Sequence, residues 1–109
     1  MADYRSRLLP EEMKVFDSST LTGVYKPLDT PISNPSRMLI FVNDSTGKCY
    51  ISWDGVKTAF PLLPGATVVL DESSNSVANA ALVTSAQTQF WVKGTATVGE
   101  ISVSTFYAS

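Results

Sequence analysis

The amino-acid sequence predicts an all-β protein: an antiparallel sandwich or barrel of about six to eight short strands, with a short N-terminal arm. Apolar runs of strand length recur between clusters of turn-forming residues, at spacings of roughly eight to twelve residues. No segment is long and periodic enough for a helix that could cover a parallel sheet. With 109 residues, the chain has the size of one ordinary domain.

Residues 1–20 are predicted to form the arm, and residues 21–109 are predicted to form the β-sandwich domain. Pro10 suits the first position of a helix, and Glu11 and Glu12 suit its first turn. A helix of one or two turns is too short to be stable alone. The arm therefore either docks on the domain or becomes ordered on a partner.

Turn-forming residues dominate residues 16–35, and their prolines rule out a regular helix. One extended piece is expected there, at residues 21–26. The first clear strand follows at residues 37–43 (RMLIFVN), which is apolar on both faces. That pattern is typical of a strand buried on two sides. Turn chemistry at residues 43–47 is expected to end it.

The next segment, residues 49–53 (CYISW), alternates in polarity and places Trp53 on its apolar face. Asp54 and Gly55 follow directly. This dipeptide between two extended runs is a strong hairpin signal, and its glycine is expected to take a positive φ. The hairpin turn is therefore assigned to these two residues, with the return strand at residues 56–62.

Further strands are expected towards the C-terminus, and the last of them has the clearest period of two. The polar segment at residues 72–88 has no clear period, so we interpret it as a loop. The remaining strands are expected at residues 66–71, 89–93 and 99–107.

Charged residues make up 17% of the chain, below the usual fraction of about 25%, whereas 44% of the residues are apolar. Two interpretations stay open. The surface is either a Ser/Thr-rich β surface in contact with water, or a neutral surface that neighbouring subunits partly cover.

The charge pattern argues against nucleic acid as a partner. The net charge is −2 and no segment concentrates Lys or Arg, whereas binding to a nucleic-acid backbone needs a basic face. The N-terminus lacks the apolar core of a signal peptide, and no run approaches the roughly 20 apolar residues of a membrane span. We therefore expect synthesis in the cytoplasm and no membrane partner.

The sequence contains no histidine, which removes the commonest general base, the commonest metal ligand and every Ser–His or Cys–His pair. Cys49 is the one cysteine, so it forms no intrachain disulfide, and we interpret it as a small core residue. A catalytic pair of carboxylates stays open, but the acidic residues fall mainly at strand ends and turns, where solvated or capping roles are expected. We expect no enzymatic activity, no metal site and no cofactor.

Three aromatic residues are candidates for a functional contact. Trp53 lies on an apolar strand face, which favours the core. Trp91 lies on the face opposite Phe90 and Val92, so it is expected to point outward if those two point inward. Because Trp is enriched among interface hot spots, we interpret Trp91 and Tyr107 as a candidate oligomer interface or, alternatively, a sugar-stacking platform.

A succession of motifs runs through most of residues 16–109: FVNDST at 41–46, YISWDGV at 50–56, LPGA at 63–66, VLD at 69–71, FWVKGT at 90–95 and ISVSTFYA at 101–108. This succession resembles a group of small tailed-bacteriophage virion proteins that share the order VN, (V/I)S(F/W)DG, LPAG, LD, (Y/W)VKGTA and V(S/T)xxYA. The third motif departs from the commoner order, because here the glycine precedes the alanine.

The resemblance implies a jelly-roll-like β-sandwich that forms homo-oligomers on the virion, as a neck, collar or tail component or as a capsid decoration. The implied partners are copies of itself and other virion proteins of the capsid, portal or tail. The resemblance carries neither catalytic residues nor a cofactor, and it implies a protein made in the host cytoplasm and located in the virion. The alternative function is a carbohydrate-binding sandwich that recognises a surface glycan of the host.

Overall fold

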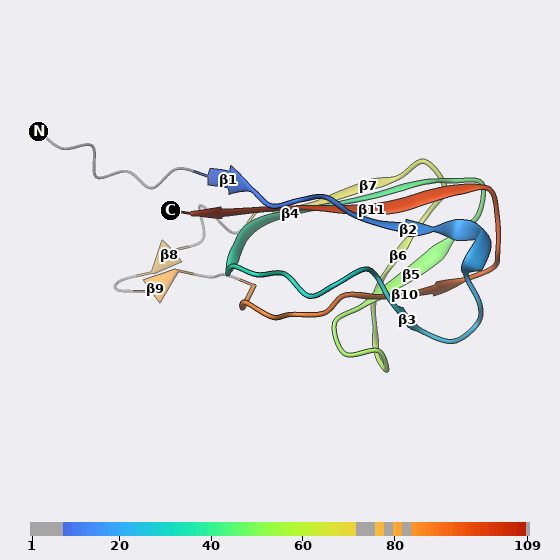
Figure 1. Cartoon of the computed structure of the whole chain (residues 1–109), viewed down its shortest axis with the longest axis horizontal. Coiled ribbons are helices and arrows are strands. Elements are labelled where there is room, and N and C mark those ends of the chain that lie inside the picture. Colours follow the sequence, from blue (N-terminus) through green and yellow to red (C-terminus); the bar gives the residue numbers. More distant parts are fainter. Residues whose placement is uncertain (1–7, 72–75, 78–79, 82–83, 109) are drawn as a thin grey trace, which may run out of the picture.

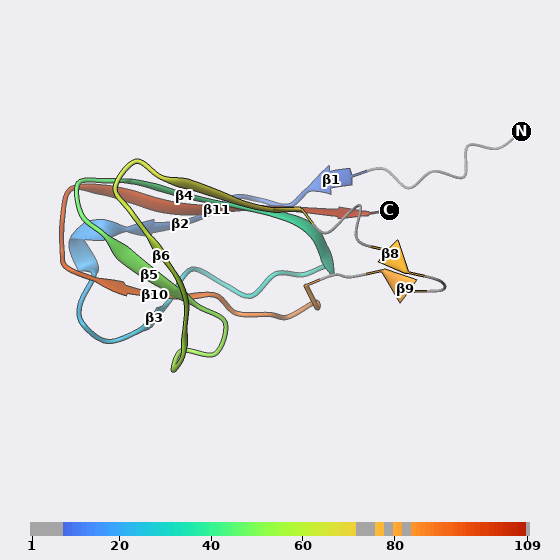
Figure 2. The same cartoon turned by 180° about the vertical axis from the view of Figure 1, so that it is seen from behind.

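The computed structural model describes residues 8–71, 76–77, 80–81 and 84–108. In this part of the chain, strands dominate and form two antiparallel sheets that pack face to face (Figures 1 and 2). The protein is therefore a β-sandwich, as the sequence predicts. The jelly-roll assignment stays a prediction.

The first sheet has five strands, and β11 lies at its centre. On one side β11 pairs with β4, and β4 pairs in turn with the edge strand β7. On its other side it pairs with β1 and β2, one after the other along its length. The strands are β1 (Leu8–Pro10), β2 (Lys14–Asp17), β4 (Ser36–Ser45), β7 (Thr67–Asp71) and β11 (Gly99–Ala108).

The second sheet has four strands in the order β3-β10-β5-β6. Its strands are β3 (Lys26–Pro27), β10 (Trp91–Gly94), β5 (Cys49–Ser52) and β6 (Thr58–Leu62). A separate two-stranded ladder pairs β8 (Ser76–Val77) with β9 (Ala80–Ala81), where the sequence predicts only a loop. Residues 72–75, 78–79 and 82–83 of that predicted loop lie outside the described residues.

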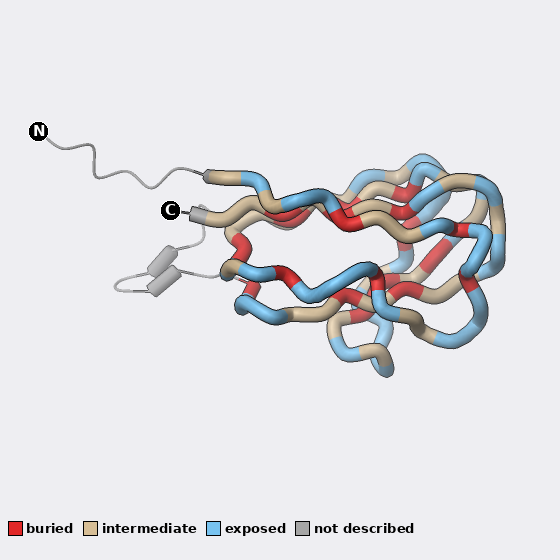
Figure 3. The backbone as a smooth tube through the Cα atoms, in the orientation of Figure 1, coloured by how far each residue is buried: buried red, intermediate tan, exposed pale blue. Residues whose placement is uncertain are grey.

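Strand β4 shows how the sequence builds the sandwich. Leu39, Phe41 and Asn43 are fully buried, whereas Ile40 and Val42 are half-buried between them. Figure 3 shows buried residues as short red segments separated by intermediate and exposed ones. The expectation of burial on two sides is wrong, because the five-stranded sheet packs against the second sheet through one face only. The other face of β4 keeps apolar side chains at the surface.

The core between the sheets is centred on four aromatic rings. Phe41 of β4 lies 5.2 Å from Phe60 and 5.4 Å from Phe90, both in edge-to-face geometry. Trp53 packs 5.8 Å from Phe41 and 5.2 Å from Phe90. Edge-to-face pairs at these centroid distances are favourable beyond their burial alone. Trp53 is partly buried and packs against the core on the side that its strand face predicts.

The proline-rich segment before β4 closes one side of the core. Leu28 and Ile32 are fully buried there. The Leu28 amide donates to the Phe90 carbonyl at 2.8 Å, and the Ile32 amide donates to the Thr88 carbonyl at 3.1 Å. The segment can follow an extended path because prolines need no partner for a backbone N–H.

The described part of the arm docks on the domain. The Glu11 amide donates to the Thr105 carbonyl at 3.0 Å, and its carboxylate accepts from the amides of Ser33 and Asn34, each at 3.0 Å. The helical turn expected around Pro10 is wrong: this residue ends β1, because β11 offers backbone partners that a lone helical turn lacks. A single 3-10 turn, η1 (Ser18–Thr20), follows β2 instead. The domain boundary at residue 20 stays a prediction.

The predicted hairpin between β5 and β6 is present, but its connection is longer than two residues. The strands end at Ser52 and resume at Thr58, so the return strand begins two residues later than expected. Gly55 has φ +79°, which confirms its predicted conformation. Asp54 explains the length, because its Oδ1 accepts from the amides of both Val56 and Lys57 at 2.8 Å and holds these residues in a loop.

Candidate functional site

The outer face of the four-stranded sheet carries aromatic and cationic side chains together. Tyr50 of β5 is paired in register with Lys93 of β10, and Trp91 is paired with Ser52 one row away. Because Ile51 and Val92 are fully buried, Tyr50, Trp91 and Lys93 point away from the core. Ser52 is also fully buried, because its hydroxyl is bonded to the β5–β6 loop. We call Tyr25, Lys48, Tyr50, Trp91 and Lys93 the tyrosine–lysine face.

The two lysines of this face lie over tyrosine rings. The Lys93 Nζ is 4.7 Å from the ring centroid of Tyr25 and 5.9 Å from that of Tyr50. The Lys48 Nζ lies 5.1 Å from the Tyr50 centroid. Tyr25 is held in place by a hydrogen bond between its hydroxyl and that of Thr58 on β6. These cation–π contacts orient the ammonium groups but leave their positive charge in place.

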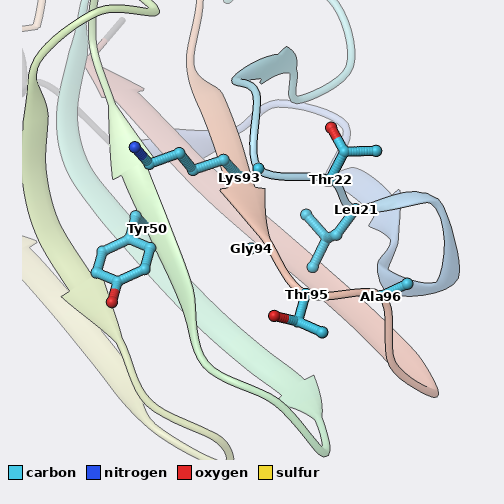
Figure 4. A pocket seen from close by; sticks show the side chains of 8 residues that line it. Leu21, Thr22, Tyr50, Lys93, Gly94, Thr95 and Ala96 are labelled. Carbon is cyan, nitrogen blue, oxygen red and sulfur yellow. The ribbon is translucent and has the colours of Figure 1, made fainter.

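An open groove of about 520 Å³ lies beside this face (Figure 4). Gly94 lines this groove, and its amide donates to the Thr22 carbonyl at 2.9 Å. A Cβ at Gly94 would lie 2.8 Å from the Lys48 carbonyl oxygen, so only glycine lets β10 and β5 approach this closely. The groove is lined by Leu21, Thr22, Gly23, Tyr50, Lys93, Gly94, Thr95 and Ala96.

The structure brings the predicted residues Trp91, Asp54 and Gly55 together. An added Cβ at Gly55 would lie 2.9 Å from Cδ2 of Trp91, so the β5–β6 loop covers part of the indole. The Ser52 hydroxyl donates to Oδ1 of Asp54 and accepts from the Gly55 amide, each at 3.0 Å. Hydrogen bonds from the Lys57 and Val56 amides and from Ser52 lower the pKa of Asp54 below its usual value.

Tyr107, the other predicted contact residue, lies in a different sheet from Trp91. It belongs to β11, where it is paired with Leu9 of β1 and with Ser36 of β4 after a register shift. Trp91 belongs to β10 of the four-stranded sheet. The two residues therefore do not form one aromatic platform, and Tyr25 and Tyr50 occupy the face of Trp91 instead.

A second surface is the outer face of the five-stranded sheet. Alternation with the buried residues of β2 and β4 directs its apolar side chains outward, and Val69 on the edge strand β7 is 53% exposed. We call Val15, Met38, Ile40, Val42 and Val69 the apolar face. On β11, which lies between β2 and β4, Ser102 and Ser104 are the residues on this same outer face.

Three carboxylates border the apolar face at one end of the sheet. Glu100 of β11 is paired in register with Asp17 on one side and with Asp44 on the other. All three residues are exposed. We call them the acidic row. Asp17 also caps η1, and the hydrogen bond from the Ser19 amide lowers its pKa.

Cys49 is fully buried on β5, and burial raises the pKa of its thiol to about 12. A thiol with this pKa stays protonated near neutral pH and is a poor nucleophile. Among the residues that the structure describes, no group of three His, Cys, Asp or Glu side chains is placed to hold a metal ion. The same described residues contain no helix long and apolar enough to cross a membrane.

Comparison of the chain with protein-family models, with curated proteins and with solved structures gave no match.

Proposed function

We propose that the protein is a structural component of a bacteriophage particle and that it assembles with copies of itself through the outer faces of its sandwich. The observation that carries this proposal is β4, which is apolar on both faces although the core covers only one of them. Neighbouring apolar side chains on the outer face of a sheet are typical of a surface that a partner covers.

The neighbours of β4 extend this surface. Ile40 is paired with Val69 on β7 and with Ser104 on β11, and Val42 is paired with Ser102. The two serines are small and neutral, so burying them costs less than burying charged side chains. The low charged fraction of the whole chain, 17%, fits a surface that is partly covered in an assembly.

The motif succession supports the bacteriophage part of the proposal. The residues that resemble the tailed-phage virion proteins map onto strands and turns of both sheets, including β4, β5, β10 and β11. Proteins of that group are structural components, so the partners proposed here are copies of this chain and the capsid, portal or tail proteins of the same particle.

The experiment compares oligomeric states. Light scattering after gel filtration is expected to show an oligomer for the unaltered chain. The variant Val69→Lys is expected to have a lower molar mass in solution, because it introduces a charge into the apolar face. Val98→Lys is the matched control, since Val98 is 79% exposed in the connection between β10 and β11 and belongs to neither outer face. A strict monomer at all concentrations, together with absence of the chain from purified particles by mass spectrometry, would overturn the proposal.

A carbohydrate-binding function is the second candidate, and the groove favours it. Tyr50 lines the groove together with Thr22 and Thr95, whose hydroxyl groups are polar partners for a sugar. On a glycan array, this function predicts a signal that Tyr50→Ala abolishes and Tyr107→Ala retains, because Tyr107 lies in the other sheet. An array without signal would remove this candidate.

A further inference from the structure

The charges of the sandwich are separated between its two outer faces. On the outer face of the four-stranded sheet, cross-strand partners form rows across the strands. One row consists of Lys93, Tyr50 and Pro61. The next row consists of Trp91, Pro27, Ser52 and Thr58. These rows contain no carboxylate, and in the β5–β6 loop beside them the negative charge of Asp54 is accompanied by the positive charge of Lys57. With Lys48 over the Tyr50 ring, the tyrosine–lysine face carries two positive charges.

The five-stranded sheet has the opposite charge. Its outward rows begin with the acidic row of Asp17, Glu100 and Asp44 and continue into Val15, Ser102, Val42 and Thr67. The following row pairs Ser104, Ile40 and Val69. These rows contain no Lys or Arg, so this face presents three negative charges beside an apolar surface.

We infer that successive copies of the chain associate head to tail, with the apolar face and acidic row of one copy seated on the tyrosine–lysine face of the next. This inference rests on the proposed self-assembly and adds its geometry. Complementary charges would lie across such a contact, with Asp44 and Glu100 opposite Lys48 and Lys93.

A symmetric contact is less favourable for either surface. Pairing two copies of the five-stranded face would bring two acidic rows towards each other, and pairing two copies of the other face would do the same with Lys48 and Lys93. Juxtaposed like charges disfavour such a pairing. A contact between unlike faces of identical copies is heterologous, and it closes into a ring or continues as a filament.

The apolar parts of the two faces are also suited to each other. Ile40, Val42 and Val69 are aliphatic, and Tyr50 and Trp91 present ring surface on the opposite side of the sandwich. Aromatic anchors surrounded by polar groups are the usual composition of the centre of an interface. Charge therefore selects the pairing, and apolar burial stabilises it.

The test is a charge swap. One variant carries Lys48→Glu and Lys93→Glu, and the other carries Asp44→Lys and Glu100→Lys; Asp17 is left unchanged because it caps η1. Each variant alone is expected to self-associate at least about tenfold more weakly than the unaltered chain. An equimolar mixture is expected to restore association, because each variant then meets the opposite charge on the other.

Sedimentation velocity reads the oligomer, and circular dichroism checks that each variant is folded. Glu12→Lys is the matched control, since Glu12 is exposed and belongs to neither charge set. If a swap variant does not fold, Asp44→Asn with Glu100→Gln and Lys48→Gln with Lys93→Gln replace it, and each is expected to weaken association.

The outcomes separate the two proposals. An unaltered chain that stays monomeric overturns the proposed self-assembly. An unaltered chain that assembles, with variants that assemble equally well alone or are not rescued by mixing, overturns the head-to-tail contact and leaves self-assembly standing.

Discussion

Asn43 shows how one polar side chain joins the two sheets at the residue scale. It is fully buried on β4, and its Nδ2 donates to the carbonyls of Gly47 and Leu62, each at 2.8 Å. Leu62 ends β6, so this hydrogen bond connects the five-stranded sheet to the four-stranded one. The sequence places Asn43 at the start of a turn, whereas the strand continues to Ser45. Composition alone does not distinguish a turn asparagine from a buried link of this kind.

Gly55 and Gly65 have nearly the same backbone conformation, so comparing an alanine substitution at each of them measures the contribution of the contact between Gly55 and Trp91. Gly55 has φ +79° and Gly65 has φ +74°, but the space beyond the Cα is open only at Gly65. Gly65→Ala is expected to lower the free energy of unfolding by about 1 kcal/mol through φ strain alone. Gly55→Ala is expected to cost about 1 kcal/mol more, because its Cβ meets the indole.

Urea denaturation measures both free energies, and the background Trp91→Ala provides the control. Once the indole is removed, the extra cost at Gly55 is expected to disappear, which a double-mutant cycle reads directly. Equal costs at Gly55 and Gly65 in the unaltered background would show that the loop does not cover Trp91.

At the scale of elements, the positions of the strands were more predictable than their ends. Alternation and the Asp54–Gly55 pair located the β5–β6 hairpin, because period and turn chemistry are local properties of the chain. The length of its connection depends on hydrogen bonds that form only when the loop closes, such as those accepted by Asp54. The docking of β2 on β11 joins residues about 85 positions apart, and no local pattern encodes that distance.

The same loop gives a prediction on pH. The pKa of Asp54 is lowered in the folded protein by hydrogen bonds from Lys57, Val56 and Ser52, so its ionised form stabilises the fold. This contribution is fully present above the unfolded value of 3.8 and is lost as the pH falls through the lower folded pKa. Asp54→Asn removes the titration while keeping an acceptor oxygen.

Thermal unfolding of both proteins as a function of pH measures this linkage. The unaltered chain is expected to have the higher midpoint at pH 7, and the difference from Asp54→Asn is expected to shrink as the pH falls below 3.8. A difference that is constant across this range would mean that the carboxylate charge does not hold the loop.

At the scale of the whole molecule, the sequence predicted a sandwich and an outward Trp91, but it could not predict the two faces. Tyr25 and Lys93 are 68 positions apart and meet only because β3 pairs with β10. Likewise, Asp17 and Asp44 lie in the same row because both are paired with Glu100 of β11. This pairing depends on the register of β11 against β2 and β4. The signal that was available in the sequence was the apolar character of both faces of residues 37–43, of which the core covers only one.

The dependence of assembly on ionic strength distinguishes the contributions of charge and apolar burial. Raising the salt concentration from about 0.1 M to about 1 M shortens the Debye length from roughly 10 Å to roughly 3 Å. A head-to-tail contact selected by Lys48 and Lys93 against Asp44 and Glu100 is therefore expected to weaken with salt. The variant Lys48→Gln with Lys93→Gln is expected to associate more weakly at low salt and to respond less to added salt. Light scattering over a salt series measures both slopes, and identical slopes would show that these lysines do not face the acidic row of a neighbouring copy.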